Sequence, residues 1–250
     1  MKKALLTIAV LALLGMGAAQ AQTHFSFRFG GNFPDGKFAD ATGDYANNNL
    51  NWGLVDNSKK GGAGIGIVAG LQMKYDISSV KGLGVIVSVD GMFNSLNSEV
   101  TDYFDDYIDD NETSTREISI TLPKYFNLPL MAGLNYTYDV KENLGIFAEA
   151  AMGANIRVIT DMENTITQAN TERITTQAFN SATTFAYRLG AGIVLNDKYT
   201  LGIDYYNLGM AKADGVTYTE VNGTESNNTP KFKAGKIKPT NITLRFGINF

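Results

Sequence analysis

Apolar and polar residues alternate with a period of two in eight separate segments of the chain. In the last segment, Ile242, Leu244, Phe246, Ile248 and Phe250 alternate with Asn, Thr, Arg, Gly and Asn. Because a strand places successive side chains on opposite faces of a sheet, each segment predicts a β-strand with one apolar face. The expected strands cover residues 24–29, 64–75, 83–94, 118–138, 146–157, 185–196, 199–206 and 242–250.

The connections between these strands alternate in length. Three of them are short, at residues 77–82, 140–143 and 196–198. The other four are long, at residues 34–62, 97–117, 160–181 and 208–239. Short turns at one end and long loops at the other are typical of an outer-membrane barrel, with extracellular long loops and periplasmic termini. The pattern predicts an all-β fold, an eight-stranded antiparallel up-and-down transmembrane β-barrel.

Aromatic residues gather at both ends of the expected strands. One group should lie at the periplasmic end: Tyr75, Tyr136, Tyr138, Tyr199 and Phe250. The other should lie at the extracellular end: Phe93, Phe126, Phe185 and Tyr187. Two aromatic belts are the pattern that rings near lipid headgroups produce. The alternate face of the strands carries glycines and charges, which suit a barrel lumen better than an apolar core.

The first residues have the composition of a secretory signal peptide. A positive start at residues 1–3 precedes an apolar run at residues 4–16, and residues 19–21 match an A-x-A cleavage site. We therefore expect a signal peptide at residues 1–21 and one outer-membrane β-barrel domain at residues 22–250. The chain has no cysteine, so the stability of the exported domain must come from the fold without disulfides.

Charge and histidine content argue against several functional classes. The net charge is −4 with a pI of about 5.1 and no basic block, so we expect no nucleic-acid partner. The only histidine is His24, which argues against histidine-rich metal sites and most catalytic triads. We expect no enzymatic activity and no cofactor.

Eight charged residues share the lumen-facing parity of the strands: Arg28, Lys74, Asp90, Glu149, Arg157, Arg188, Asp204 and Arg245. An eight-stranded barrel has an interior that side chains fill or that holds one small ligand. An unpaired charge there would cost several kcal/mol, so these residues should form ion pairs. Asp204 and Arg245 lie on neighbouring strands and should be close together. A structural ion-pair network is the first interpretation, and a gated polar pathway is the second.

Two of the long loops are charged. Residues 97–117 contain a dense group of carboxylates, of which Asp105, Asp106, Asp109 and Asp110 are weak candidates for a Ca²⁺ site. Their spacing lacks the D-x-D-x-D-G pattern, so a solvated acidic loop is the preferred interpretation. The last loop carries Lys231, Lys233, Lys236 and Lys238, which either are solvated or meet the anionic headgroups of lipopolysaccharide.

A proline interrupts the fourth expected strand. Pro129 donates no hydrogen bond, and a closed barrel offers no free edge to accommodate it. We therefore expect a bulge or a local break near residues 128–130.

Three stretches resemble a known family. They are YFNLPLMAGLNYTY at 125–138, YRLGAGIVLNDKYTLGIDYYNLG at 187–209 and ITLRFGINF at 242–250. The chain resembles the Bacteroidota-type outer-membrane β-barrel domain family and, more distantly, the small eight-stranded barrels of the OmpX, OmpA and OmpW types. The resemblance implies that Leu244, Phe246, Ile248 and Phe250 form the signal that the barrel-assembly machinery reads. It identifies a fold and specifies no chemistry.

Three functions remain open at this point. The first is a structural or surface-interaction barrel in the bacterial outer membrane, contacting lipid and lipopolysaccharide and displaying its long loops to an unknown extracellular partner. The second is an OmpW-like channel for small molecules. The third is an outer-membrane lipid-modifying enzyme.

Overall fold

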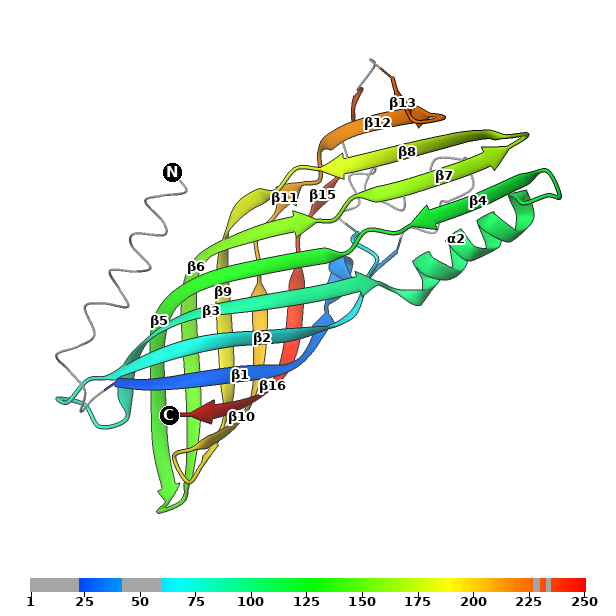
Figure 1. Ribbon diagram of the computed structural model, residues 1–250. Helices are drawn as coiled ribbons and strands as arrows, with labels where there is room; N and C mark the ends of the chain where they lie inside the picture. The colour runs from blue at the N-terminus through cyan, green and yellow to red at the C-terminus, as the bar shows by residue number, and fades with distance from the viewer. Residues whose placement is uncertain (1–22, 42–59, 227–229, 233–234) are drawn as a thin grey trace.

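The computed structural model describes residues 23–41, 60–226, 230–232 and 235–250 of the chain. The signal peptide expected at residues 1–21 lies outside the described residues. The described residues form a β-barrel and a second sheet that continues beyond one end of it (Figure 1).

Eight antiparallel strands close the barrel, which confirms the predicted fold class. They are β1 (Thr23–Pro34), β2 (Ala63–Asp76), β3 (Leu83–Leu96), β5 (Tyr125–Lys141), β6 (Leu144–Ile159), β9 (Ala182–Leu195), β10 (Tyr199–Asn207) and β16 (Thr240–Asn249). The order around the barrel is β1-β16-β10-β9-β6-β5-β3-β2, so β1 and β16 pair and leave no open edge. Each strand otherwise neighbours the barrel strands next to it along the chain.

The outer face of the barrel is apolar, and its inner face is mostly polar, with a small apolar cluster that includes Val68, Ile86 and Met131. In β16, Ile242 and Leu244 are exposed, whereas Asn241, Thr243 and Arg245 are buried. This alternation is what lipid outside and a polar lumen inside require. Most residues of the two expected aromatic groups are exposed on this outer face: Tyr75, Tyr136, Tyr138, Tyr199 and Phe250 from one group, Phe126, Phe185 and Tyr187 from the other.

Two of the three short turns at one end of the barrel contain residues with left-handed backbone angles. Asn196 and Asp197, between β9 and β10, have φ angles of 52° and 55°. Two consecutive positive φ angles at Asn and Asp are the geometry of a tight hairpin whose twist matches its strands. Gly82, before β3, has a φ of 81°. These turns lie at the end of the barrel where the chain enters β1 and leaves β16, which we call the short-turn end (Figure 1).

The four long connections lie at the opposite end, which we call the long-loop end, and three of them contribute strands to a second sheet. This second sheet has the order β13-β12-β8-β7-β4, with β14 also paired to β12. Its strands are β4 (Arg116–Thr121), β7 (Met162–Gln168), β8 (Thr171–Phe179), β12 (Gly215–Val221), β13 (Thr224–Glu225) and β14 (Lys231–Phe232). Figure 1 shows this sheet projecting well beyond the barrel.

The prediction of a single strand over 118–138 was wrong. Residues 116–121 form β4 and pair with β7 in the second sheet, whereas Tyr125 begins β5 in the barrel. Residues 122–124 separate the two strands. The alternation continues across this break because both strands bury one face, so periodicity alone did not reveal the change of sheet.

The interpretation of residues 97–117 as an acidic loop was also wrong. Most of this segment forms α2 (Ser98–Asn111). Asn97 caps the helix, because its side-chain oxygen accepts a hydrogen bond from the N–H of Val100 at 3.1 Å. Val100 and Phe104, four residues apart, are buried on one face of the helix. The carboxylates occupy the exposed face, so their density reflects one side of an amphipathic helix.

No bulge forms at Pro129. The β5–β6 register runs without a shift from Leu128 opposite Ile156 to Leu130 opposite Ala154. On the other side, the β3–β5 register is the same before and after the proline, but the pairs opposite Pro129 and Leu128 are missing. The proline therefore interrupts one ladder locally, as its missing N–H requires, without displacing the strand.

An apolar cluster closes the long-loop end of the barrel. It includes Phe38, from the 3-10 helix η2 (Gly36–Phe38), and Ile237, from a small sheet formed by β11 (Ala211–Lys212) and β15 (Lys236–Ile237). Phe38 packs edge-on against Tyr125, with ring centroids 5.1 Å apart. The other buried members are Ala41, Ala63, Leu96, Val100, Phe104, Ile159, Met162 and Ala213. This cluster joins α2, the loops and the barrel rim.

Candidate functional site

The barrel lumen contains a buried layer of six charged residues, which we call the ionic layer. Three are arginines and three are carboxylates: Arg28, Arg188, Arg245, Asp90, Glu149 and Asp204. The charges are balanced, and they come from β1, β3, β6, β9, β10 and β16. All six were expected in the lumen from their strand parity.

Asp90 links two of the arginines. Its Oδ1 accepts a hydrogen bond from Nη2 of Arg28 at 2.9 Å, and its Oδ2 accepts one from Nη1 of Arg188 at 3.3 Å. The hydroxyl of Tyr206 also donates to Oδ2 at 3.0 Å. A fully buried carboxylate is stable only when such partners replace water, so this arrangement compensates much of its desolvation cost.

Glu149 is the second bridging carboxylate. Its Oε2 accepts from Nη2 of Arg188 at 2.9 Å, and its Oε1 accepts from Nε2 of Gln72 at 2.8 Å. The Oε1 of Gln72 in turn accepts from Arg28 and from Nη2 of Arg188, the latter at 2.9 Å. Gln72 thus holds two arginines and one glutamate in fixed positions.

Asp204 and Arg245 form a two-point contact, in which Nε and Nη2 of the arginine donate to the two carboxylate oxygens. Parallel hydrogen bonds of this kind orient both groups. Each of the two aspartates of the ionic layer occupies space that a glycine on a neighbouring strand leaves free. A Cβ at Gly190 would lie 2.1 Å from Oδ1 of Asp204, and a Cβ at Gly70 would lie 2.2 Å from Oδ1 of Asp90.

Strand parity identified the charged members but missed three polar ones, Gln72, Ser88 and Tyr206. Each lies two residues from a charged lumen residue on its own strand, namely Lys74, Asp90 and Asp204. Strand parity therefore also places these three residues in the lumen, but the prediction of ion pairs covered only charged side chains.

Two of the eight predicted residues lie outside the ionic layer. Lys74 is nearer the short-turn end, where its Nζ is 3.0 Å from Oδ1 of Asp76. Arg157 lies near the long-loop end and donates to three backbone carbonyls, those of Ala211, Lys212 and Ile237, at 3.4, 2.7 and 3.3 Å. Arg157 therefore binds β11 and β15 across the end of the barrel.

A layer of amides separates the ionic layer from the long-loop end. Five lumen-facing asparagines are buried there: Asn32, Asn94, Asn127, Asn155 and Asn241. Asn32 and Asn94 are each four residues beyond a member of the ionic layer, about 13 Å along the strand. Nδ2 of Asn32 donates to Oδ1 of Asn94 at 2.8 Å, and Nδ2 of Asn155 donates to Oδ1 of Asn127 at 3.0 Å.

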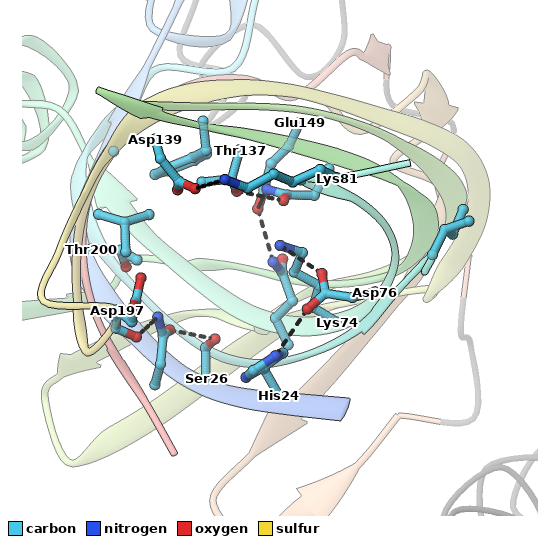
Figure 2. Close-up of a pocket in the computed structure, with 18 of the residues that line it drawn as sticks. His24, Ser26, Lys74, Asp76, Lys81, Thr137, Asp139, Glu149, Asp197 and Thr200 are labelled. Carbon is cyan, nitrogen blue, oxygen red and sulfur yellow. Dashed lines mark hydrogen bonds and ion pairs between the residues drawn. The ribbon is translucent and has the colours of Figure 1, made fainter. Parts of the chain in front are cut away.

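On the other side of the ionic layer the lumen widens into a cavity of about 540 Å³. Figure 2 shows this cavity with labelled residues from several barrel strands and turns around it. Arg28, Gln72, Glu149 and Arg245 line its inner end. Near its opening, Nε2 of His24 lies 2.9 Å from Oδ2 of Asp76.

The other sequence candidates lie outside the lumen. Asp105, Asp106, Asp109 and Asp110 are exposed on α2, and no group of three or more potential metal ligands occurs in the described part of the chain. Lys231 on β14 is exposed in the second sheet, Lys236 and Lys238 are exposed on and just after β15, and Lys233 lies outside the described residues. Leu244, Phe246 and Ile248 lie on the lipid face of β16, and the N–H of Phe250 donates to the carbonyl of Phe25 at 2.8 Å.

No helix within the described ranges is both long enough and apolar enough to cross a bilayer.

A comparison with models of protein families identifies the family of this chain. A family model described as "Outer membrane protein beta-barrel domain" matches residues 6–250. The chain belongs to this family. As an outer-membrane β-barrel protein, it resides in the outer membrane, and its lipid-facing surface and polar lumen agree with that location.

Solved structures with similarity to this outer-membrane barrel include three bacterial proteins. OprG from Pseudomonas aeruginosa is 15% identical, with a TM-score of 0.44, and the match covers 92% of this chain and 96% of that chain. A major outer membrane protein from Thermus thermophilus is 12% identical, with a TM-score of 0.43 and coverages of 91% and 99%. Ail, the attachment invasion locus protein of Yersinia pestis, is 11% identical, with a TM-score of 0.34 and coverages of 92% and 99%. No curated protein sequence matches the chain.

Proposed function

We propose that this protein is a non-catalytic surface-interaction barrel, which anchors the second sheet and α2 outside the cell. In this proposal the short-turn end and both termini face the periplasm, and the long-loop end is extracellular. Lipid and lipopolysaccharide surround the barrel, and the exposed Lys231, Lys236 and Lys238 meet anionic headgroups. The β16 segment ending in Phe250 serves as the assembly signal for the barrel-assembly machinery.

The main support for the proposal is that side chains fill the lumen. The ionic layer crosses the barrel from β1 to β9, since Arg28 and Arg188 both contact Asp90. The asparagine layer and the apolar cluster lie between it and the long-loop end. Passage of a solute through the barrel would require these buried ion pairs to separate, which costs several kcal/mol for each charge left unpaired. The filled lumen therefore supports an anchoring role over an OmpW-like channel.

The second sheet supports the display part of the proposal. It extends the long loops into an ordered structure, and α2 with its C-cap residue Glu112 presents seven exposed carboxylates: Glu99, Asp102, Asp105, Asp106, Asp109, Asp110 and Glu112. A rigid sheet with an acidic helix offers a preorganised surface, so less conformational entropy is lost when a partner binds.

Single-channel recording in a planar bilayer tests the proposal against a channel. We expect no discrete conductance steps from the purified barrel at neutral pH, whereas a wide porin inserted under the same conditions gives large steps. Insertion must be verified by recovering the folded protein from the bilayer lipid. Reproducible unitary steps from the folded barrel would reject the closed-lumen proposal and favour the channel.

A lipid-modifying enzyme would be detected differently. Mass analysis of lipid A and phospholipids from cells with and without the protein should show identical species under the proposal. A lipid product found only in the presence of the protein would overturn the non-catalytic role.

A further inference from the structure

The cavity at the short-turn end has features that a purely structural ionic layer does not require. Its volume of about 540 Å³ falls within the range of about 300–1,000 Å³ that is usual for small-molecule sites. Short-turn residues such as Lys81 and Asp197 line it (Figure 2), and Arg28, Glu149 and Arg245 of the ionic layer lie at its inner end. A ligand would therefore enter from the short-turn end and stop at the ionic layer.

The charges around the cavity are balanced and largely paired. Four cationic residues, Arg28, Lys74, Lys81 and Arg245, line it together with four carboxylates, Asp76, Asp139, Glu149 and Asp197. Lys81 lies 3.1 Å from Asp139 near the opening, and the arginines are engaged in the ionic layer. A charged ligand would find no net attraction and would have to compete with these pairs, so the cavity favours a neutral ligand.

Between the charged pairs, the walls carry neutral hydrogen-bonding groups. Seven hydroxyl and amide side chains line the cavity: Ser26, Gln72, Ser78, Asn135, Thr137, Thr200 and Asn249. Amides and hydroxyls each donate and accept hydrogen bonds. Such a wall suits a ligand that is rich in hydroxyl groups of its own.

One aromatic ring completes the wall. Phe147, on β6, is half-buried and lines the cavity. A Cβ at Gly192 would lie 2.7 Å from Cζ of this ring, and a Cβ at Gly202 would lie 3.0 Å from it. The ring therefore reaches along the wall over the glycines of β9 and β10. The face of an aromatic ring is electronegative, so it attracts the weakly positive C–H groups of a sugar ring.

We propose that this cavity binds a neutral saccharide of about one or two rings. The C–H face of one sugar ring stacks on Phe147, and the sugar hydroxyls form hydrogen bonds with the amides and hydroxyls that surround the cavity. The proposal is independent of the surface-interaction role, which concerns the opposite end of the barrel.

Calorimetric titration of the full-length folded protein tests this proposal. The protein is held in an amine-oxide detergent, because maltoside and glucoside detergents carry competing sugars. The probes are glucose, maltose, N-acetylglucosamine and its β-1,4-linked dimer, with mannitol as an acyclic polyol. We expect saturable binding of at least one cyclic sugar and none of mannitol, which lacks a ring face for stacking. The monomer and dimer probes also distinguish a free sugar from the end of a glycan chain.

Two variants make the test specific. Phe147→Leu should weaken the binding of that sugar by about tenfold, because it removes the aromatic face and keeps an apolar side chain. Phe126→Leu, on the outer face at the long-loop end, should bind it as the unsubstituted protein does. Each variant is first shown to be folded by its different gel mobility before and after boiling.

Several results would overturn the proposal. They are an absence of saturable heat with every cyclic sugar, equal binding of mannitol, or unchanged affinity in Phe147→Leu. If Phe147→Leu does not fold, NMR of the unsubstituted protein decides the question. The proposal then requires sugar-dependent shifts at Phe147 and Thr200, and shifts confined to other residues reject it.

Discussion

At the residue scale, the buried charges of the lumen stabilise the barrel only when each of them has its partners. Arg188 contacts Asp90 and Glu149, and both side chains of the Arg188–Asp90 pair are fully buried. Burying an ion costs several kcal/mol, and its partners recover that cost only when every member is present. Substituting one member should therefore destabilise the barrel more than removing a surface charge does.

Arg245→Ala tests this dependence. The substitution leaves the buried carboxylate of Asp204 with Nε of Arg188, at 3.8 Å, as its nearest remaining guanidinium nitrogen. We expect a loss of about 3–5 kcal/mol in the free energy of unfolding, the usual effect of breaking a buried ion pair. Urea unfolding of the lipid-reconstituted barrel measures it.

Lys81→Ala is the matched control for that experiment. Lys81 also forms an ion pair, but its side chain is 89% exposed and that of Asp139 is 55% exposed. Exposed pairs contribute about 0–1 kcal/mol, so this variant should unfold nearly as the unsubstituted protein does. Equal stability of the two variants would show that the ionic layer does not stabilise the barrel.

A glycine variant tests the same layer without removing a charge. In Gly190→Ala, the new Cβ would overlap the carboxylate of Asp204 and displace it from Arg245. We expect a destabilisation of about 1–3 kcal/mol from this overpacking. A lower midpoint of thermal loss of the fast-migrating gel band would report it. Gly91→Ala should leave the midpoint unchanged or slightly higher, because its Cβ would meet no atom closer than 3.7 Å.

At the element scale, alternation and turn residues predict where strands form, but they do not predict which sheet each strand joins. The segment around 118–138 reads as one strand, and the structure divides it between two sheets. The acidic sequence of α2 resembles a loop because only two of its residues, Val100 and Phe104, are buried, and carboxylates surround them in the sequence. In both cases packing against the apolar cluster at the long-loop end contributes to the local structure.

Arg157 is predicted to stabilise the small β11–β15 sheet. Its guanidinium donates to three carbonyls of that sheet, and hydrogen bonds to charged groups are worth about 1.5–3 kcal/mol each. Arg157→Met keeps much of the apolar stem and removes the donors. We expect proteinase K to cleave residues 208–239 at least about tenfold faster in this variant.

The control for that experiment is Arg173→Met. Arg173 is exposed on β8, so its loss should leave the rate of cleavage unchanged. If Arg157→Met were also cleaved at the original rate, the closure of the long-loop end would have to rest on the apolar cluster alone.

At the scale of the whole molecule, the two ends of the barrel differ in shape and chemistry. One end carries short turns and an open cavity, and the other carries the apolar cluster, α2 and the second sheet (Figure 1). The barrel wall between them has an apolar outer face.

Epitope tags test that orientation. One tag is inserted at the β7–β8 turn, after Ala169, and one at the β5–β6 turn, after Glu142. We expect antibodies to label intact cells only for the first tag, because long loops of such barrels lie outside. The second tag should become accessible after the outer membrane is permeabilised. Labelling of the second tag alone in intact cells would reverse the proposed orientation.

The sequence by itself determined the number of barrel strands, the face of each strand, the alternation of short and long connections and which charges enter the lumen. It could do so because side-chain direction in a strand depends only on parity, and lipid demands an apolar residue at every second position. Tertiary structure alone decided that six of eight charges form one layer, that Gln72 and Tyr206 join it, and that the long loops form a sheet. Those outcomes depend on contacts between strands far apart in the chain, such as Arg188 with Asp90, and no local pattern specifies them.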